Sequence, residues 1–150
     1  MEQHQCSILA DPEGKAWDFA FSIYQILSQK CDKFELNKVI INKFKDGEIK
    51  PKIEKNVRNK VVFFIHDSNK DPKEWFTELA LVNQTLKYSS AKEINDVLPY
   101  LKFARQDRKD ETRVPISAKV VADVISLYTD RVISLDIHNP AIQGFYVIPF

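Results

Sequence analysis

The sequence predicts an α/β fold: a three-layer sandwich with a mostly parallel sheet. Short apolar runs rich in β-branched and aromatic residues alternate along the chain with segments whose apolar residues recur at helical spacing. One run, Val61–Ile65 (VVFFI), is apolar at every position, which is typical of a parallel strand covered on both faces. With 150 residues, the chain has the length of a single domain.

The first part of the chain is predicted to form a strand, a helix and a hairpin. Cys6–Ala10 is the first strand, and a DPEG turn leads into a helix over residues 15–28. Apolar residues cover so wide a face of this helix that we expect it to be deeply buried or used in an interface. Residues 38–44 and 48–53 should pair around a Lys-Asp-Gly turn, with Pro51 favouring an edge strand.

The second part is predicted to add two helices and two strands. Asp71 is placed to cap a helix that runs to about Tyr88, with Pro72 at its first position and Glu74 positioned for a capping box. The remaining elements are a strand over Glu93–Tyr100, a helix over residues 116–128 and a strand over Arg131–Asp136.

Composition excludes several classes of protein. The chain is 44% hydrophobic and 29% charged with a net charge of +1, so we expect neither nucleic-acid binding nor attraction to an anionic membrane. No apolar run approaches the ~20 residues of a transmembrane helix, and the N-terminal MEQHQC does not resemble a signal peptide. Cys6 and Cys31 lack metal-type spacing and are expected to be reduced thiols. These features favour a cytoplasmic protein.

Polar groups follow three of the predicted strands directly. They are the pair His66 and Asp67, a charged loop at residues 105–113, and Asp136 with His138. Ligands of open α/β sheets bind beyond the carboxyl ends of the strands, so we expect these groups to meet in one crevice. For His66 and Asp67, a role in a turn or cap is the alternative. The absence of GxxxxGK[ST] and GxGxxG argues against a P-loop kinase or a Rossmann dehydrogenase.

The charged loop (residues 105–113, RQDRKDETR) holds four basic and three acidic side chains. Arginine offers a rigid, permanently charged fork that suits phosphate, and several in one loop could hold a polyphosphate. The alternative is a solvated loop whose charges pair with each other. The position of the loop at a strand end favours phosphate binding.

Two further groups suggest a metal ion and a nucleobase. Asp136 and His138 lie two residues apart in an extended segment and could hold a divalent cation that a nucleotide phosphate completes. The alternative is a histidine hydrogen-bonded to its neighbour, because two ligands specify no metal. Phe44, Asp46 and Glu48 would project from the hairpin and suit a purine with an exocyclic amine, although Asp-Gly is also an ordinary hairpin turn.

Four segments resemble the N-terminal half of the ribose-phosphate pyrophosphokinases, also called phosphoribosyl pyrophosphate synthetases. They are KFKDGE (43–48), NVRNKVVFFI (56–65), LPYLKFARQDRKDETRVPISAKVVADVI (98–125) and LDIHNPAIQGFYVIP (135–149). The resemblance implies a phosphoribosyltransferase-like fold and a homo-oligomer. It also implies the transfer of diphosphate from ATP, with Mg²⁺, to ribose 5-phosphate for nucleotide biosynthesis.

The resemblance also implies roles for individual residues. Arg105 and Gln106 would contact ATP, while Phe44, Asp46 and Glu48 would contact adenine from a neighbouring subunit. Arg105 and His138 would be catalytic, and His138 with Asp136 would serve the magnesium site. Arg58 matches a position associated with phosphate-type allosteric control in some members.

The sequence departs from the family in three places and in length. The turn ADPEGKA lacks the usual small residues, HDSNKDPKEWF replaces an Asn-Asp loop, and Val147 replaces an aspartate proposed as a metal ligand. The ribose-phosphate, diphosphate and flexible catalytic loops belong to a C-terminal half beyond residue 150. We therefore expect residues 1–150 to be an N-terminal domain, inactive alone, that ends inside a larger protein. The alternatives are a non-catalytic regulatory or scaffolding homologue that associates with a true synthetase, and an unrelated nucleotide-binding module.

Overall fold

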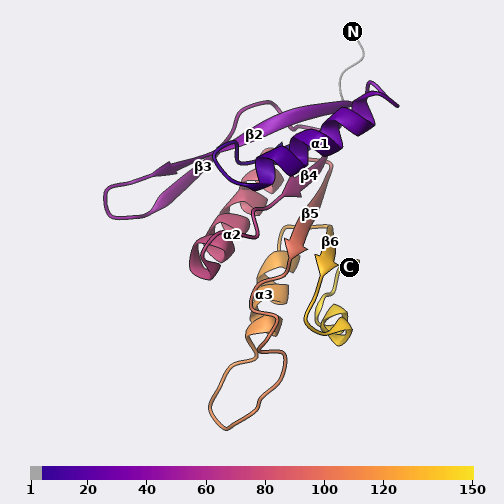
Figure 1. The fold of residues 1–150 in the computed structure, drawn as a ribbon. Helices are drawn as coiled ribbons and strands as arrows, with labels where there is room; N and C mark the ends of the chain where they lie inside the picture. The colour runs from indigo at the N-terminus through magenta and orange to yellow at the C-terminus, as the bar shows by residue number, and fades with distance from the viewer. Residues whose placement is uncertain (1–4) are drawn as a thin grey trace.

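The computed structural model describes residues 5–150 and forms a single six-stranded sheet with helices on both faces (Figure 1). Residues 1–4, which carry most of the N-terminal stretch compared with a signal peptide, lie outside the described residues. The elements in chain order are β1 (Cys6–Ala10), α1 (Ala16–Ser28), β2 (Phe34–Lys43), β3 (Ile49–Ile53), β4 (Val61–Ile65), α2 (Pro72–Tyr88), β5 (Glu93–Tyr100), α3 (Ser117–Ser126), β6 (Arg131–Asp136) and a 3-10 helix, η1 (Pro140–Phe145).

The sheet confirms the predicted fold class. Its strand order is β3-β2-β1-β4-β5-β6, and every neighbouring pair is parallel except β2 and β3, which form the predicted antiparallel hairpin. Pro51 lies in β3 at the edge of the sheet, where its missing N–H costs no ladder bond. β2 begins at Phe34 rather than at the predicted residue 38. The prediction started too late because the buried polar residues Glu35 and Asn37 interrupt the apolar pattern of the strand.

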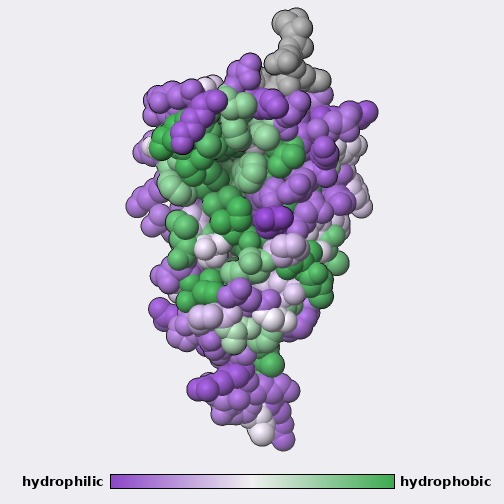
Figure 2. Space-filling view, turned by 90° about the vertical axis from the view of Figure 1, so that its right-hand side faces the viewer, coloured by the Kyte–Doolittle hydropathy of each residue, from purple (hydrophilic) through white to green (hydrophobic). Residues whose placement is uncertain are grey.

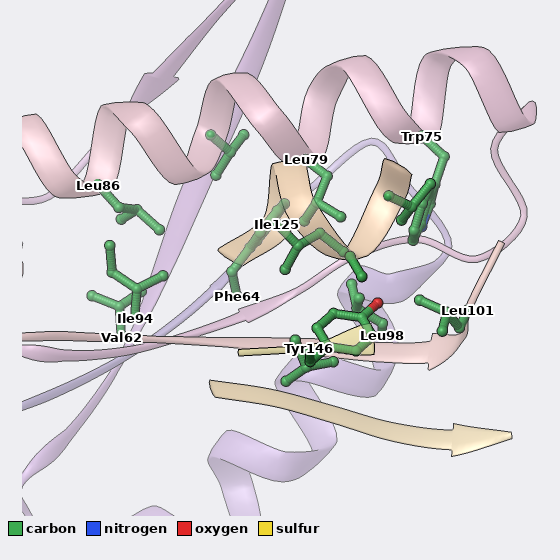
Figure 3. Packing of buried hydrophobic residues seen from close by; sticks show 14 of the residues in the cluster. Val62, Phe64, Trp75, Leu79, Leu86, Ile94, Leu98, Leu101, Ile125 and Tyr146 are labelled. Carbon is green, nitrogen blue, oxygen red and sulfur yellow. The ribbon is translucent and has the colours of Figure 1, made fainter. Parts of the chain in front are cut away.

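The larger part of the core lies between the sheet and the helices α2 and α3 (Figure 3). Leu79 of α2 and Ile125 of α3 point toward Phe64 on β4, while Trp75 of α2 points toward the sheet farther along, and all four side chains are buried. Asp71 caps α2 as predicted, since its carboxylate accepts a hydrogen bond from the backbone N–H of Lys73. The expected capping box is wrong, because Glu74 instead binds the Lys43 ammonium of β2 at 2.7 Å.

Helix α1 covers the other face of the sheet, over β1, β2 and part of β4. Only Ala16 and Ala20 of this helix are buried, whereas Phe19 and Ile26 are 41% and 57% exposed. The expectation of a deeply buried helix is therefore wrong, and its use in an interface stays a prediction. Within residues 5–150, no helix combines the length and the apolar character needed to cross a bilayer.

The charged loop joins β5 to α3 and extends away from the body of the molecule. It forms the orange loop at the lower end of Figure 1 and a hydrophilic protrusion at the same end of Figure 2. Apolar side chains gather higher up, over the body of the fold (Figure 2). The charged loop therefore presents its side chains at one pole of the domain.

Candidate functional site

A hollow of about 460 Å³ lies between the charged loop and the segment that follows β6. β5 and β6 are neighbouring parallel strands, so the chain leaves both at the same edge of the sheet. The hollow is lined by Arg105, Gln106, Asp107, Arg108, Asp110, His138, Asn139 and Pro140. Two of the three polar groups predicted to meet, the charged loop and His138, are thus brought together.

The arginines of the charged loop are free to bind a ligand. Among the described residues, no ion pair or hydrogen bond involves the guanidinium groups of Arg105, Arg108 or Arg113. All three residues are exposed. The alternative in which these charges pair with the acidic residues of the same loop is therefore not what the structure shows. Two unpaired guanidinium groups at one hollow suit a polyanion.

Gln106 holds the charged loop closed from within. Its side-chain Nε2 lies 2.8 Å from the carbonyl oxygen of Arg108 and 3.3 Å from both the Asp110 carboxylate and the Pro115 carbonyl oxygen. The backbone carbonyl oxygen of Gln106 accepts a hydrogen bond from the Ala118 N–H at the start of α3. The Gln106 amide nitrogen is therefore occupied, which leaves the amide oxygen for the contact with ATP that was predicted.

Asn139 joins the two walls of the hollow and was not predicted to matter. Its Nδ2 donates to Asp107 Oδ2 at 2.9 Å, while its Oδ1 accepts from the Ala141 N–H at 3.0 Å and caps η1. The dipeptide Asn139-Pro140 matches the preferred residues for an N-cap and first helical position, and so could have predicted η1. The link to Asp107 has no sequence pattern, because 32 residues separate the pair.

Asp136 and His138 are both exposed, and only His138 lines the hollow. Asp136 ends β6 opposite Tyr100. No group of three or more His, Cys, Asp or Glu side chains in residues 5–150 is arranged to hold a metal ion. Mg²⁺ in nucleotide sites commonly uses one or two protein carboxylates and takes its other ligands from phosphates and water. One exposed carboxylate and one imidazole make no cage by themselves, so Mg²⁺ held here would need phosphate and water for its other ligands.

The hairpin residues lie away from this hollow. β2 and β3 project beyond the rest of the sheet at the edge opposite β6 (Figure 1). Phe44 is 51% exposed, and the Asp46 carboxylate accepts from the Glu48 N–H at 3.1 Å, as in an ordinary turn. Glu48 lines a different hollow, against α2. One chain alone therefore does not bring Phe44, Asp46 and Glu48 to Arg105.

Asp67 lines a separate hollow of about 370 Å³ between β1, β4 and α2. Its carboxylate accepts from the backbone N–H groups of Lys15 at 2.9 Å and Asn69 at 2.8 Å. Burial raises the pKa of Asp67, but these N–H groups outweigh it and hold the pKa below its usual value. Asp67 therefore binds the start of α1, and the expectation that it joins the charged loop is wrong.

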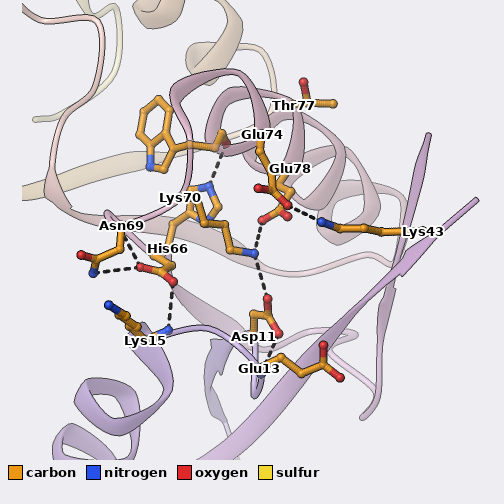
Figure 4. Close-up of polar contacts among 12 residues, drawn as sticks. Asp11, Glu13, Lys15, Lys43, His66, Asn69, Lys70, Glu74, Thr77 and Glu78 are labelled. Carbon is orange, nitrogen blue, oxygen red and sulfur yellow. Dashed lines mark hydrogen bonds and ion pairs between the residues drawn. The ribbon is translucent and has the colours of Figure 1, made fainter. Parts of the chain in front are cut away.

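Several charges that line the second hollow pair with one another. Lys70 Nζ donates to Asp11 at 2.8 Å and to Glu78 at 2.6 Å (Figure 4). His66 lies behind this cluster, with its Nε2 2.8 Å from the Trp75 carbonyl oxygen. Burial lowers the pKa of His66 to about 4, so its ring is neutral near pH 7. The role of His66 is structural.

A family model for the N-terminal domain of ribose phosphate pyrophosphokinase matches residues 15–128. The chain belongs to this family. Ribose-phosphate pyrophosphokinases from Helicobacter hepaticus and Bacillus caldolyticus are 46% and 45% identical to it, over 80% and 77% of the chain. Those matches cover only 39% and 37% of the two relatives, so the chain spans about two-fifths of their length.

One solved structure agrees with the family assignment, and a second shares the fold. The phosphoribosylpyrophosphate synthetase of Mycobacterium smegmatis matches 97% of this chain with a TM-score of 0.82 and 31% identity, and the match covers 47% of that chain. A hypoxanthine-guanine phosphoribosyl transferase of L. donovani matches 89% of the chain and 64% of its own, with a TM-score of 0.55 and 10% identity. The second likeness shows the fold alone, which is the phosphoribosyltransferase-like fold that was predicted.

Arg58, the position linked to allosteric control in some pyrophosphokinases, lies far along the fold from the charged loop. It is exposed and comes just before β4 begins at Val61. The amino ends of the parallel strands lie at the edge of the sheet opposite to their carboxyl ends. Any ligand of Arg58 would therefore bind at a different end of the domain from a ligand of Arg105.

Proposed function

We propose that this chain is the N-terminal, ATP-side domain of a ribose-phosphate pyrophosphokinase. The whole enzyme would transfer the β,γ-diphosphoryl group of Mg-ATP to the anomeric hydroxyl of ribose 5-phosphate. The observation that carries the proposal is the hollow that holds unpaired Arg105 and Arg108 opposite His138. Diphosphoryl transfer depends on positioning and charge neutralisation more than on covalent chemistry, and this hollow offers both.

Arg105 and Arg108 would bind the phosphate oxygens of ATP, and Arg105 would stabilise charge that develops on the transferred group. The Gln106 amide oxygen would accept from the nucleotide. His138 would orient the polyphosphate from the opposite wall. Together with Asp136, it would bind the Mg²⁺ ion that the phosphates of ATP carry. Bound Mg²⁺ would neutralise negative charge on the transferred group.

The adenine contacts of Phe44, Asp46 and Glu48 would come from another subunit of a homo-oligomer. The position of the hairpin, projecting beyond the sheet edge and distant from Arg105 in its own chain, supports this arrangement. Phe44 is exposed and ready to stack on a base. Each complete ATP site would then lie between two chains.

Isothermal titration calorimetry of the chain with Mg-ATP tests the nucleotide site. Arg105→Ala and His138→Ala should each weaken binding, whereas Arg131→Ala, which removes an exposed arginine of β6 outside the hollow, should not. Equal affinities for all three variants and the wild type would contradict the assignment. The isolated chain should show little turnover of ribose 5-phosphate with Mg-ATP, and robust turnover would contradict its role as an incomplete half.

A further inference from the structure

The two walls of the Arg105 hollow differ in how firmly they are held. The segment after β6 is anchored in the core, because Ile142 of η1 is buried and Tyr146 follows it into the same cluster. The Val132 N–H also donates to the Pro149 carbonyl oxygen at 2.9 Å, which ties the end of this segment back to β6. This wall therefore has a fixed position relative to the sheet.

The outer part of the charged loop has no such anchor, although the backbone carbonyl oxygen of Gln106 accepts from the Ala118 N–H of α3 at the base of the loop. Residues 108–113 are all exposed, and the side chain of Gln106 binds only acceptors of the loop and its end at Pro115. Closure by Gln106 sets the shape of the loop but does not set its distance from His138. Among the described residues, Asn139 to Asp107 is the side-chain hydrogen bond that spans the hollow.

We propose that Asn139 is a positioning residue for the ATP site: it fixes the charged loop at the distance from His138 at which both walls can bind one polyphosphate. This inference rests on the proposed function. Asn139 is suited to the task because its two amide atoms act in opposite directions. Oδ1 caps the anchored helix η1, and Nδ2 donates to Asp107 in the exposed loop that forms the opposite wall.

The same bond places Arg105 and Arg108 on either side of the fixed point, since Asp107 lies between them in the sequence. The bond also occupies Asp107 Oδ2, one of the carboxylate oxygens that would otherwise compete with phosphate for a guanidinium group. Loss of the bond should thus loosen the loop and lower the affinity for polyanions together.

Exchanging the two side chains, so that residue 139 carries the carboxylate and residue 107 the amide, separates this role of Asn139 from its capping of η1. Asn139→Asp keeps a good N-cap for Ala141 but sets a carboxylate against Asp107, so the bond is lost. Asp107→Asn in the same chain restores a donor on the opposite side and returns the net charge to that of the wild type. The three proteins to compare are the wild type, the single variant Asn139→Asp and the double variant Asn139→Asp/Asp107→Asn.

Amide hydrogen exchange over residues 105–113 without ligand is the first measurement. The single variant should exchange roughly tenfold faster in the loop, as expected for the loss of a hydrogen bond to a charged group, and the double variant should return toward the wild type. Exchange in β5 and α3 should not change. An unchanged loop in the single variant, or a double variant as fast as the single one, would overturn the proposal.

Calorimetry with inorganic tripolyphosphate is the second measurement. The single variant should bind roughly tenfold more weakly and the double variant should recover most of the loss. Recovery of loop protection without recovery of affinity would overturn the positioning role. If the wild type itself does not bind tripolyphosphate, the proposed function fails, and the positioning role, which rests on it, is overturned with it.

Discussion

Asp96 on β5 and Thr129 before β6 are joined by a 2.7 Å hydrogen bond in the centre of the core, where both residues are buried. Asn83 of α2 donates to the same carboxylate oxygen at 2.7 Å, while the other oxygen and the nearby Tyr146 hydroxyl have no partner in the described structure. Burial raises the pKa of Asp96 to about 7, and the two hydrogen bonds offset only part of this effect.

Stability should therefore fall as pH rises through the Asp96 transition. The folded protein holds the Asp96 proton up to about pH 7, whereas the unfolded chain releases it near 3.8, so unfolding becomes easier between those values. His66, whose pKa is lowered to about 4, acts in the opposite direction between pH 4 and 6.5. Comparison with Asp96→Asn isolates the Asp96 contribution.

The free energy of unfolding in urea at pH 5 and pH 8 checks this prediction. Relative to the wild type, the free energy of unfolding of Asp96→Asn should be higher at pH 8 than at pH 5, by on the order of a few kcal/mol. A difference that is the same at both pH values would show that Asp96 is ionised in the fold throughout.

Lys70→Met should destabilise the protein strongly. The substitution leaves Glu78, which is buried and whose Oε1 already lacks a partner, without its counter-charge. Removal of one partner of a buried pair costs about 3–5 kcal/mol, whereas replacing both partners with apolar residues often costs little. Lys70→Met/Glu78→Met should therefore be more stable than Lys70→Met in urea unfolding, and the opposite order would contradict the prediction.

Gly14→Ala tests the contact that holds Asp67. A Cβ at this position would lie 3.0 Å from Asp67 Oδ2, the oxygen that accepts from the Lys15 N–H. The carboxylate would have to move, and we expect a loss of about 1–2 kcal/mol in the free energy of unfolding. Gly144→Ala is the matched control, since nothing lies within 4 Å of the added Cβ, and it should have a much smaller effect.

Mixing two variants that each bind Mg-ATP weakly tests whether the hairpin acts between chains. Phe44→Ala and Arg105→Ala chains should each bind Mg-ATP weakly as homo-oligomers. Mixed oligomers would contain some sites in which an intact hairpin meets an intact Arg105, so refolding the two together should recover part of the binding measured by calorimetry. If the mixture bound Mg-ATP no better than the average of the two separate variants, Phe44 would not act on a neighbour's Arg105 site.

Most of the fold could be predicted from local patterns. Asp71-Pro72 marked the start of α2, Asp46-Gly47 marked the hairpin, and the boundaries of β1, β4, β5 and β6 followed from their apolar runs. One exception was the start of β2, where Glu35 is buried because Lys60, 25 residues away, neutralises it at 2.9 Å. A long-range ion pair of this kind leaves no periodic pattern in the sequence.

The candidate site was predictable only in part, and for the same reason. Arg105 and His138 could be placed together because parallel neighbouring strands end at one edge. The partners of Asp67 and Asn139 depend on which loop leans toward which helix, and this is decided by packing. Asp67 turned toward the N–H of Lys15, and Asn139 toward Asp107.

The order of the strands reverses between β1 and β4, and that is where open α/β sheets usually receive their ligands. In this domain the place is already taken: Asp67 supplies the anion at the start of α1, and Lys70 supplies the cation between Asp11 and Glu78. The most familiar ligand position of the fold is thereby turned into an internal brace. The unpaired arginines lie instead beside the edge strand β6. A molecule bound there is accessible to another domain or another chain.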